Sequence, residues 1–260
     1  MLEIVTNDLK ENLHTLIKNT QKKLIYCSPF LRKSIIMDII EHVKNKSDLE
    51  IEIITSANLA NFMIGASDLK VLEELLAKKI KVKNYQSLVN QIYFFDNQAL
   101  LTQTSICENS FCDKVEFGIL SDTFEEQFFS RMIESTIYGQ ISNEEYKDIK
   151  LIYNKLNKKC KYHCDSSGDL IFQISKITDL SNKFSASWQK NVLLFLNSNI
   201  KTDVFTLKQF YAGINFFQIL YPNSDNIEAR MRRTLQELRD RGLIKFYGNG
   251  VYKKLWGISS

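Results

Sequence analysis

The hydrophobic positions between residues 223 and 255 follow two different periods. An apolar stripe at helical spacing predicts a helix with one inward face. It consists of Ile227, Met231, Thr234, Leu235 and Leu238. Ser224 suits the N-cap of this helix and Gly242 its end. The segments LIKFY and VYKKL then flank Gly248-Asn249-Gly250, which favours a tight hairpin. The segment therefore predicts a helix followed by a two-stranded wing.

Polar side chains occupy the opposite side of the predicted helix, when residues are placed at about 100° each. Those expected to face base edges or to flank them are Asn226, Ala229, Arg230, Arg233 and Gln236. Arg can form two hydrogen bonds with guanine, and Asn or Gln can do so with adenine. The residues expected to contact phosphate are Arg232 on the helix and Lys245, Lys253 and Lys254 on the hairpin. We therefore expect double-stranded DNA as the partner.

The charge distribution supports this interpretation. From Ser187 onward there are 11 of the 34 Lys and Arg residues but only 5 of the 30 Asp and Glu residues, a net charge of +6. The other 23 basic and 25 acidic residues give the rest of the chain a net charge of −2. Such asymmetry is typical of a nucleic-acid-binding segment. The alternative is a helix and hairpin whose basic face is only solvated.

Residues 1–140 show alternating helical and strand patterns. Helices are expected at 8–20, 34–43 and 67–79, strands at 23–27, 50–55, 80–84 and 115–120, a hairpin around Asp96-Asn97, and a last helix carrying Phe124, Phe128, Met132, Ile133 and Ile137. This order predicts an α/β sandwich with a largely parallel sheet.

Two further segments follow this α/β domain. Residues 141–186 read as a connector with a polar helix at 143–156 and a hairpin, and residues 187–260 as the last domain. A helix is expected at 188–197, and a second one is expected to be capped by Thr206. The aromatic residues expected in the core of this last domain are Trp188, Phe205, Phe210, Tyr211, Phe216, Phe217 and Phe246.

The length and composition of the chain limit the class of protein to which it can belong. The chain has 260 residues, 44% of them hydrophobic, which is enough for two domains with their own cores. There is no run of about 18 apolar residues and no N-terminal signal pattern, so we expect a soluble, cytoplasmic protein without membrane attachment. Five cysteines indicate free thiols rather than a disulfide framework. No cofactor is expected.

The C-terminal segment resembles the winged helix at the C-terminus of Dam-replacing proteins and adenine-methyl-dependent restriction endonucleases. The matching positions are Trp188, residues 205–211 and 220–223, Arg232, Leu235, Gln236, residues 238–240, Gly242 and residues 248–255. The resemblance implies DNA binding at a short adenine-containing site and sensitivity to methylation.

The N-terminal segment resembles the phospholipase D-type fold of some restriction nucleases, which carries His-x-Lys-x4-Asp and a later Glu. Asp96 and Glu116 stand at the acidic positions, but Val89 replaces the nucleophilic His and Gln91 replaces the Lys. Valine cannot attack phosphorus, and glutamine offers no charge to the transferring group. The resemblance therefore implies a mixed sheet sandwiched by helices, and a homodimer, without the activity.

Other candidate sites are weaker. Cys160, His163 and Cys164 are loosely spaced, and they make a zinc site only if they meet Cys107 and Cys112, so we expect no metal. Glu50 and Glu52 share a strand face, but no Lys follows them at the spacing familiar from metal-dependent nucleases.

The sequence thus favours a DNA-binding protein of a bacterial restriction or defence system, with a catalytically degenerate phospholipase D-like domain for dimerisation or docking. One alternative is a type II restriction endonuclease whose active site is unrecognised or completed by a partner chain. A second alternative is a transcription regulator.

Overall fold

The computed structural model describes residues 2–5, 9–44, 46, 48–85, 88, 90–102, 118–122, 139–159, 161–167, 169–184 and 186–258. Contacts between residues divide the chain into two compact units. The N-terminal unit comprises Met1–Ala57 and Ile64–Asn143, and the C-terminal unit comprises Asn58–Met63 and Glu144–Ser260. Residues 144–186 therefore group with the C-terminal residues.

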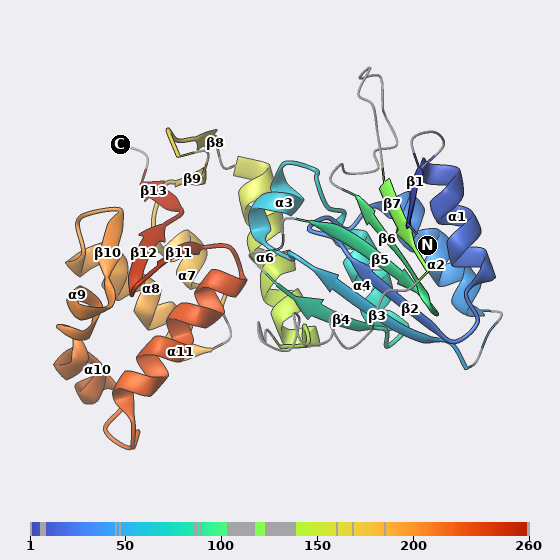
Figure 1. Cartoon of the computed structure of the whole chain (residues 1–260). Helices are drawn as coiled ribbons and strands as arrows, with labels where there is room; N and C mark the ends of the chain where they lie inside the picture. Colours follow the sequence, from blue (N-terminus) through green and yellow to red (C-terminus); the bar gives the residue numbers. More distant parts are fainter. Residues whose placement is uncertain are drawn as a thin grey trace. The chain divides into compact units, whose positions relative to one another are not determined.

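The N-terminal unit contains a seven-stranded mixed sheet in the order β1-β7-β6-β5-β2-β3-β4 (Figure 1). The strands are β1 Leu2–Val5, β2 Lys23–Cys27, β3 Glu50–Thr55, β4 Lys81–Asn84, β5 Gln91–Phe95, β6 Gln98–Thr102 and β7 Gly118–Ser121. Among the strands that the structure describes in this unit, only β2, β3 and β4 are parallel neighbours. The expectation of a largely parallel sheet is wrong, because the β5–β6 hairpin, β7 and the unpredicted β1 all add antiparallel pairs.

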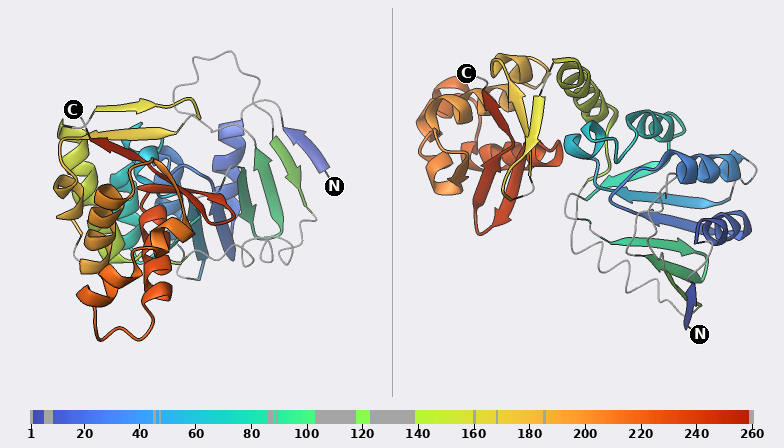
Figure 2. Two further views of the ribbon diagram at one scale, coloured as in Figure 1. Left: turned by 90° about the vertical axis from the view of Figure 1, so that its left-hand side faces the viewer. Right: turned by 90° about the horizontal axis from the view of Figure 1, so that it is seen from above.

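Three helices pack side by side on one face of this sheet: α1 Leu9–Asn19, α2 Lys33–Lys44 and α4 Leu69–Ala77 (Figure 2). Leu9 of α1 approaches so closely that a Cβ at Gly118 would lie 2.9 Å from its side chain. The other face carries a smaller buried cluster of Ile25, Cys27, Ile54, Phe94 and Ala99. The helix predicted from Phe124 to Ile137 lies outside the described residues.

The C-terminal unit is mainly helical around one continuous core. Its helices are α3 Leu59–Met63, α6 Asn143–Lys159, α7 Thr178–Ser181, α8 Ser187–Asn199, α9 Leu207–Tyr211, α10 Ile214–Leu220 and α11 Ile227–Asp240. Leu59 of α3 is fully buried in this core together with Leu193 and Leu235. None of the described helices combines the length and the apolar character that crossing a membrane requires.

Two three-stranded sheets complete the C-terminal unit. The first has the order β10-β12-β11, formed by β10 Val204–Thr206, β11 Ile244–Gly248 and β12 Val251–Lys254. The second has the order β13-β9-β8, formed by β8 Lys161–Cys164, β9 Leu170–Ile174 and β13 Trp256–Ile258. Only Leu255 separates β12 from β13, and its carbonyl accepts a hydrogen bond from Phe172 N–H at 2.9 Å. The β8–β9 hairpin is therefore attached directly to the wing strands.

Candidate nucleic-acid interface

The helix predicted to precede the wing is α11, and its two ends are fixed by different groups. Asn226, not Ser224, is the N-cap, because its side-chain oxygen accepts the N–H of Ala229 at 2.9 Å. Ser224 N–H instead donates to Tyr221 O in the preceding turn. At the other end Gly242 has φ +74°, and Leu243 N–H donates to Leu238 O at 3.0 Å. This left-handed ending confirms the predicted stop at Gly242.

The apolar stripe of α11 faces inward as predicted. All five of its residues are buried: Ile227, Met231, Thr234, Leu235 and Leu238. The hydroxyl of Thr234 donates to the carbonyl of Arg230 at 2.9 Å, so this polar group is satisfied inside the helix. The stripe packs against α8, α9, α10 and β11. Burial of this stripe fixes which polar side chains of α11 face solvent.

The opposite face of α11 is exposed and mostly basic or amide-bearing. The exposed residues on this face are Asn226, Ala229, Arg232, Arg233 and Gln236, and Glu228 is exposed at its edge. Glu237 also lies next to this face and accepts from Arg233 Nε at 3.2 Å and from Gln189 Nε2 at 2.5 Å. Glu237 was not among the predicted site residues, although its spacing of four residues from Arg233 is a signal for such a pair.

Arg230 lies at the flank of this face over an aromatic stack. Its guanidinium carbon is 5.9 Å from the ring of Trp188, which stacks on Tyr221 with ring centroids 4.0 Å apart. The hydroxyl of Tyr221 accepts from the side-chain amide of Asn191 at 2.8 Å. Cation–π contact and stacking therefore hold Arg230 beside the exposed face rather than in its centre.

A groove of about 450 Å³ lies beside the first turn of α11. It is lined by residues of α10, of the turn before α11 and of the first turn of α11, including Tyr221, Asp225, Asn226 and Glu228. The sequence pattern did not indicate it. Its two carboxylates make it unfavourable for phosphate, so a phosphate backbone is better accommodated along the arginine-rich part of the helix.

The wing is a tight hairpin, as the Gly-Asn-Gly sequence predicts. Asn249 and Gly250 both have positive φ, at 49° and 74°, and connect β11 to β12. Two consecutive positive φ values match the twist of the flanking strands. Phe246 and Tyr247 are exposed on β11, at 41% and 47%. Phe246 and Phe216, which is 43% exposed, were both expected in the core, and this expectation is wrong.

Two of the three wing lysines are not the exposed groups that the sequence suggested. Lys253 and Lys254 are only 7% and 6% exposed. Lys254 donates to the carbonyl of Ile200 at 2.9 Å, and burial lowers its pKa. Lys253 forms ion pairs with Asp165 and Asp169, and Lys245 pairs with Asp169 as well. These partners lie some 80 residues away along the chain, so no local pattern could have indicated them.

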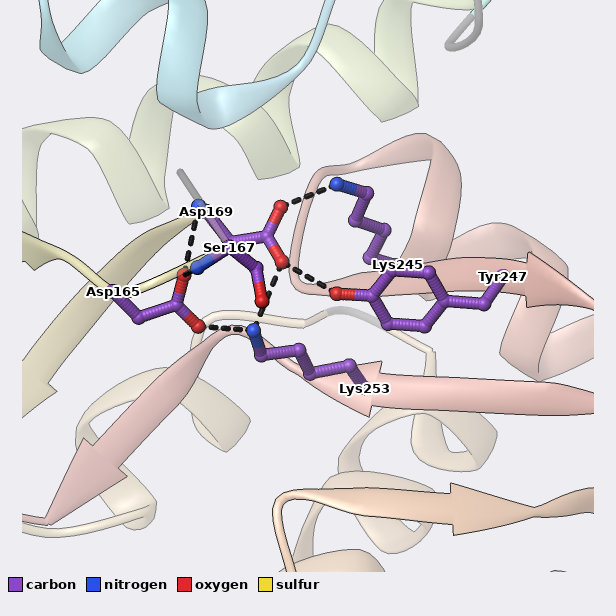
Figure 3. Close-up of polar contacts among 6 residues, drawn as sticks. All are labelled: Asp165, Ser167, Asp169, Lys245, Tyr247 and Lys253. Atoms are coloured by element: carbon purple, nitrogen blue, oxygen red, sulfur yellow. Dashed lines mark hydrogen bonds and ion pairs between the residues drawn. The ribbon is translucent and has the colours of Figure 1, made fainter.

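Asp165 and Asp169, which bracket the β8–β9 turn, form what we term the wing clamp with Lys245, Tyr247 and Lys253 (Figure 3). Burial alone raises the pKa of Asp169, but hydrogen bonds from the three wing residues outweigh it and lower the pKa to about 2. The hydrogen bond from Lys253 likewise lowers the pKa of Asp165. Both carboxylates are therefore ionised at neutral pH.

The phospholipase D-like motif positions are only partly within the described residues, since Val89 and Glu116 lie outside them. Gln91, at the position of the Lys, is 4% exposed and accepts from the hydroxyl of Tyr93 at 2.8 Å. Tyr93 in turn lies against Tyr26, with ring centroids 5.3 Å apart, and burial raises the pKa of Tyr93. Gln91 is thus held in a buried, uncharged hydrogen-bonded pair.

Asp96 has a structural role. It occupies the β5–β6 turn with φ +51°, and its carboxylate accepts the N–H groups of Gln21, Lys22 and Lys23 at 2.8–2.9 Å. Burial raises the pKa of Asp96, but these three N–H groups lower it more. The side chain therefore fastens the hairpin to the start of β2 rather than projecting toward a substrate.

The metal candidates form no site among the residues that the structure describes. Cys107, Cys112 and Cys160 lie outside those residues. His163 and Cys164 are both exposed on β8. Glu50 and Glu52 are engaged by lysines, Lys23 at 3.9 Å and Lys83 in a closer ion pair. These carboxylates therefore already have cationic partners from the chain.

Comparisons with known proteins give three results. The comparison with curated proteins found no match. Among solved structures, the chain is similar to Nuc from Salmonella typhimurium, a phospholipase D family member, at 7% identity and TM-score 0.46, over 55% of this chain and 99% of that one. It is also similar to NucT from Helicobacter pylori, at 12% identity and TM-score 0.37, over 54% and 98%.

The archaeal chromatin protein TrmBL2 is a third similar structure, at 12% identity and TM-score 0.36, over 52% of this chain and 50% of that one. All three likenesses are remote. The family model described as the Dam-replacing HTH domain, by contrast, matches at the level of sequence over residues 175–254. Its range includes α8 to α11, the strand β10 and the wing strands β11 and β12. Residues 175–254 of this chain therefore match the model of the Dam-replacing HTH domain and have a winged-helix fold.

Proposed function

We propose that this protein binds double-stranded DNA through the exposed face of α11, as part of a bacterial restriction or defence system. The observation that carries the proposal is that burial of the apolar stripe leaves Arg232, Arg233 and Gln236 together on one exposed face. Such a helix fits the major groove, where Arg and Gln side chains can discriminate bases. The match of residues 175–254 to a Dam-replacing HTH domain supports the same partner.

The N-terminal unit is proposed to dimerise or dock rather than to cleave DNA. Val89 offers no nucleophile, Gln91 is neutral and buried, and Asp96 is saturated by backbone N–H groups. A homodimer would present two α11 helices and would favour a palindromic site. Size-exclusion chromatography with light scattering tests the homodimer, and a monomer would contradict it.

Binding to a DNA duplex, measured by fluorescence anisotropy, tests the role of α11. Arg232→Ala is expected to weaken binding to all sequences and to reduce the slope of log K against log salt by about 0.9, the value for one lost phosphate contact. Arg233→Ala is expected to weaken a preferred site, selected from a random pool, more than unrelated DNA. The matched control is Lys147→Ala, which removes one positive charge from an exposed position of α6. Equal affinities for all four proteins would refute the proposal.

Incubation with methylated and unmethylated plasmid separates binding from cleavage. A mobility shift of intact DNA, with Mg²⁺ and with EDTA, is the expected result. Cleavage that requires Mg²⁺ would support the alternative of a type II restriction endonuclease with a carboxylate site. Cleavage in EDTA would overturn the inference that the phospholipase D-like motif is inactive. A preference for methylated adenine would support the restriction context over a transcription regulator.

A further inference from the structure

The wing carries two lysines directly opposite each other. Lys245 on β11 and Lys253 on β12 are paired across the hairpin. Like charges at such positions repel each other and destabilise the strand pair. The chain offsets this repulsion with carboxylates from the β8–β9 turn, which is a separate hairpin in the same unit. The carboxylate of Asp169 therefore already lies at the position where the basic side chains of the wing converge.

The Asp169 carboxylate is held by a defined set of hydrogen-bond donors (Figure 3). Asp169 accepts from Lys245, from Lys253 Nζ at 2.9 Å and from the hydroxyl of Tyr247 at 2.6 Å. One oxygen of Asp165 also accepts from Lys253. Its other oxygen accepts the N–H groups of Ser167 at 2.9 Å and Asp169 at 3.0 Å. Asp165 thereby shapes the turn that presents Asp169 to the wing.

Two ammonium groups and a phenol are also a suitable donor set for a phosphate oxygen. Charge-assisted hydrogen bonds from Lys and hydrogen bonds from Tyr are common in contacts with the DNA backbone. The side chain of Lys245 is 44% exposed, although its ammonium pairs with Asp169. Lys253, whose side chain is 9% exposed, is covered by the turn. A phosphate can therefore approach Lys245 first but can reach Lys253 only if the turn moves away.

We propose that the Asp165–Asp169 turn is an intramolecular competitor of DNA phosphate at the wing. In the free protein it occupies Lys245, Tyr247 and Lys253, and the wing engages the backbone fully only when the turn is displaced. This inference rests on the proposed function. Its consequence is weaker sequence-independent binding, since phosphate contacts supply most of the affinity for unrelated DNA. Base contacts from α11 then decide which sites overcome the competition.

Neutralising the turn tests the proposal. The variant Asp165→Asn/Asp169→Asn keeps the side-chain shapes but removes both negative charges. Its affinity for an unrelated duplex should rise on the order of tenfold at low salt, and its slope of log K against log salt should steepen by up to about 1.8, or 0.9 for each released lysine. Adding Lys245→Gln and Lys253→Gln to this variant should return the slope to that of the wild type.

The matched control is Asp122→Asn/Glu144→Gln, which makes the same change in net charge at two exposed positions. It should leave the slope unchanged. If the clamp variant and this control behave alike, the turn does not compete with DNA and the proposal is wrong. If Asp165→Asn/Asp169→Asn unfolds, as judged by circular dichroism, the single variant Asp165→Asn is decisive. It neutralises only one of the two carboxylates that pair with Lys253, and it should still steepen the slope.

The outcomes also separate this inference from the proposed function. If the wild type binds DNA and Arg232→Ala weakens that binding, but the clamp variants keep the wild-type slope, only the competition fails. If neither the wild type nor any variant binds a duplex at low salt, the assignment of α11 to DNA fails as well.

Discussion

The buried ion pair between Arg241 and Asp148 should control the stability of the C-terminal unit. The two side chains are each 6% exposed, with Nη2 and Oδ2 3.2 Å apart. Arg241 also donates to the carbonyl of Glu237 at 2.9 Å and lies over the ring of Phe184. It is the C-cap of α11, whereas Asp148 belongs to α6. The pair therefore ties the end of the proposed recognition helix to a distant helix.

Replacing Arg241 by Met removes the counter-charge of a buried carboxylate. At 3.2 Å and an effective dielectric constant of about 20, the attraction is about 5 kcal/mol. Most of it offsets the desolvation of the two ions, but that cost remains for the carboxylate when the cation is deleted. Arg241→Met should therefore lower the free energy of unfolding by roughly 3–5 kcal/mol. The double variant Arg241→Met/Asp148→Leu should recover most of this loss.

Tryptophan fluorescence during urea denaturation measures the free energy of unfolding of the C-terminal unit. The only two tryptophans of the sequence, Trp188 and Trp256, both belong to the C-terminal unit. Arg233→Met is the matched control, since Arg233 pairs with Glu237 while its own side chain is 69% exposed. The control should cost no more than about 1 kcal/mol.

Two results would refute this reasoning. An Arg241→Met variant that loses less than about 1 kcal/mol would show that the buried pair contributes no net stability. A double variant as unstable as the sum of the two single variants would show that the residues are not coupled.

Three further predictions follow from single sites. Gly242→Ala should destabilise the C-terminal unit by at least about 1–2 kcal/mol in urea denaturation, because φ is +74° and the new Cβ would lie 2.8 Å from Leu59 N; a smaller loss would contradict this. The pKa of Asp169 is lowered from 3.8 to about 2, so the stability that its ionised form contributes is complete above pH 3.8 and is lost as the pH falls through 2. In an acid titration of unfolding, the variant Asp169→Asn should lack this pH-dependent loss of stability. Iodoacetamide should label exposed Cys164 before Cys27, which is 1% exposed and whose pKa burial raises to about 12; equal rates by mass spectrometry would contradict this.

The parts of the fold that were predictable are those whose signals are local. The stripe of α11, its end at Gly242 and the positive-φ turn at Asn249 all follow from residues within one or two turns of each other. The cap at Thr206 is of the same kind, since its hydroxyl accepts the N–H of Gln209. Local geometry is encoded in neighbouring residues, so these predictions needed no knowledge of tertiary contacts.

The parts that were missed depend on distant partners. The strand β1 has only four residues and is recognisable only through its pairing with β7. Lys253 looked like a solvent-facing wing residue because its carboxylate partners come from a different hairpin. Ser224 and Asn226 are both good caps by type, and only the backbone path of the preceding turn decides between them.

The continuity of β12 with β13 determines which residues must be exchanged together when the DNA-binding segment is moved into another protein. A chimera that ended at Lys254 would contain every residue of the matched HTH domain yet would lack Trp256, which is 3% exposed in the shared core and pairs with Phe172 of β9. A chimera that began after β9 would lack Phe172, the residue that pairs with Trp256. A functional swap of DNA specificity between such proteins should therefore exchange the β8–β9 hairpin and β13 together with the winged helix.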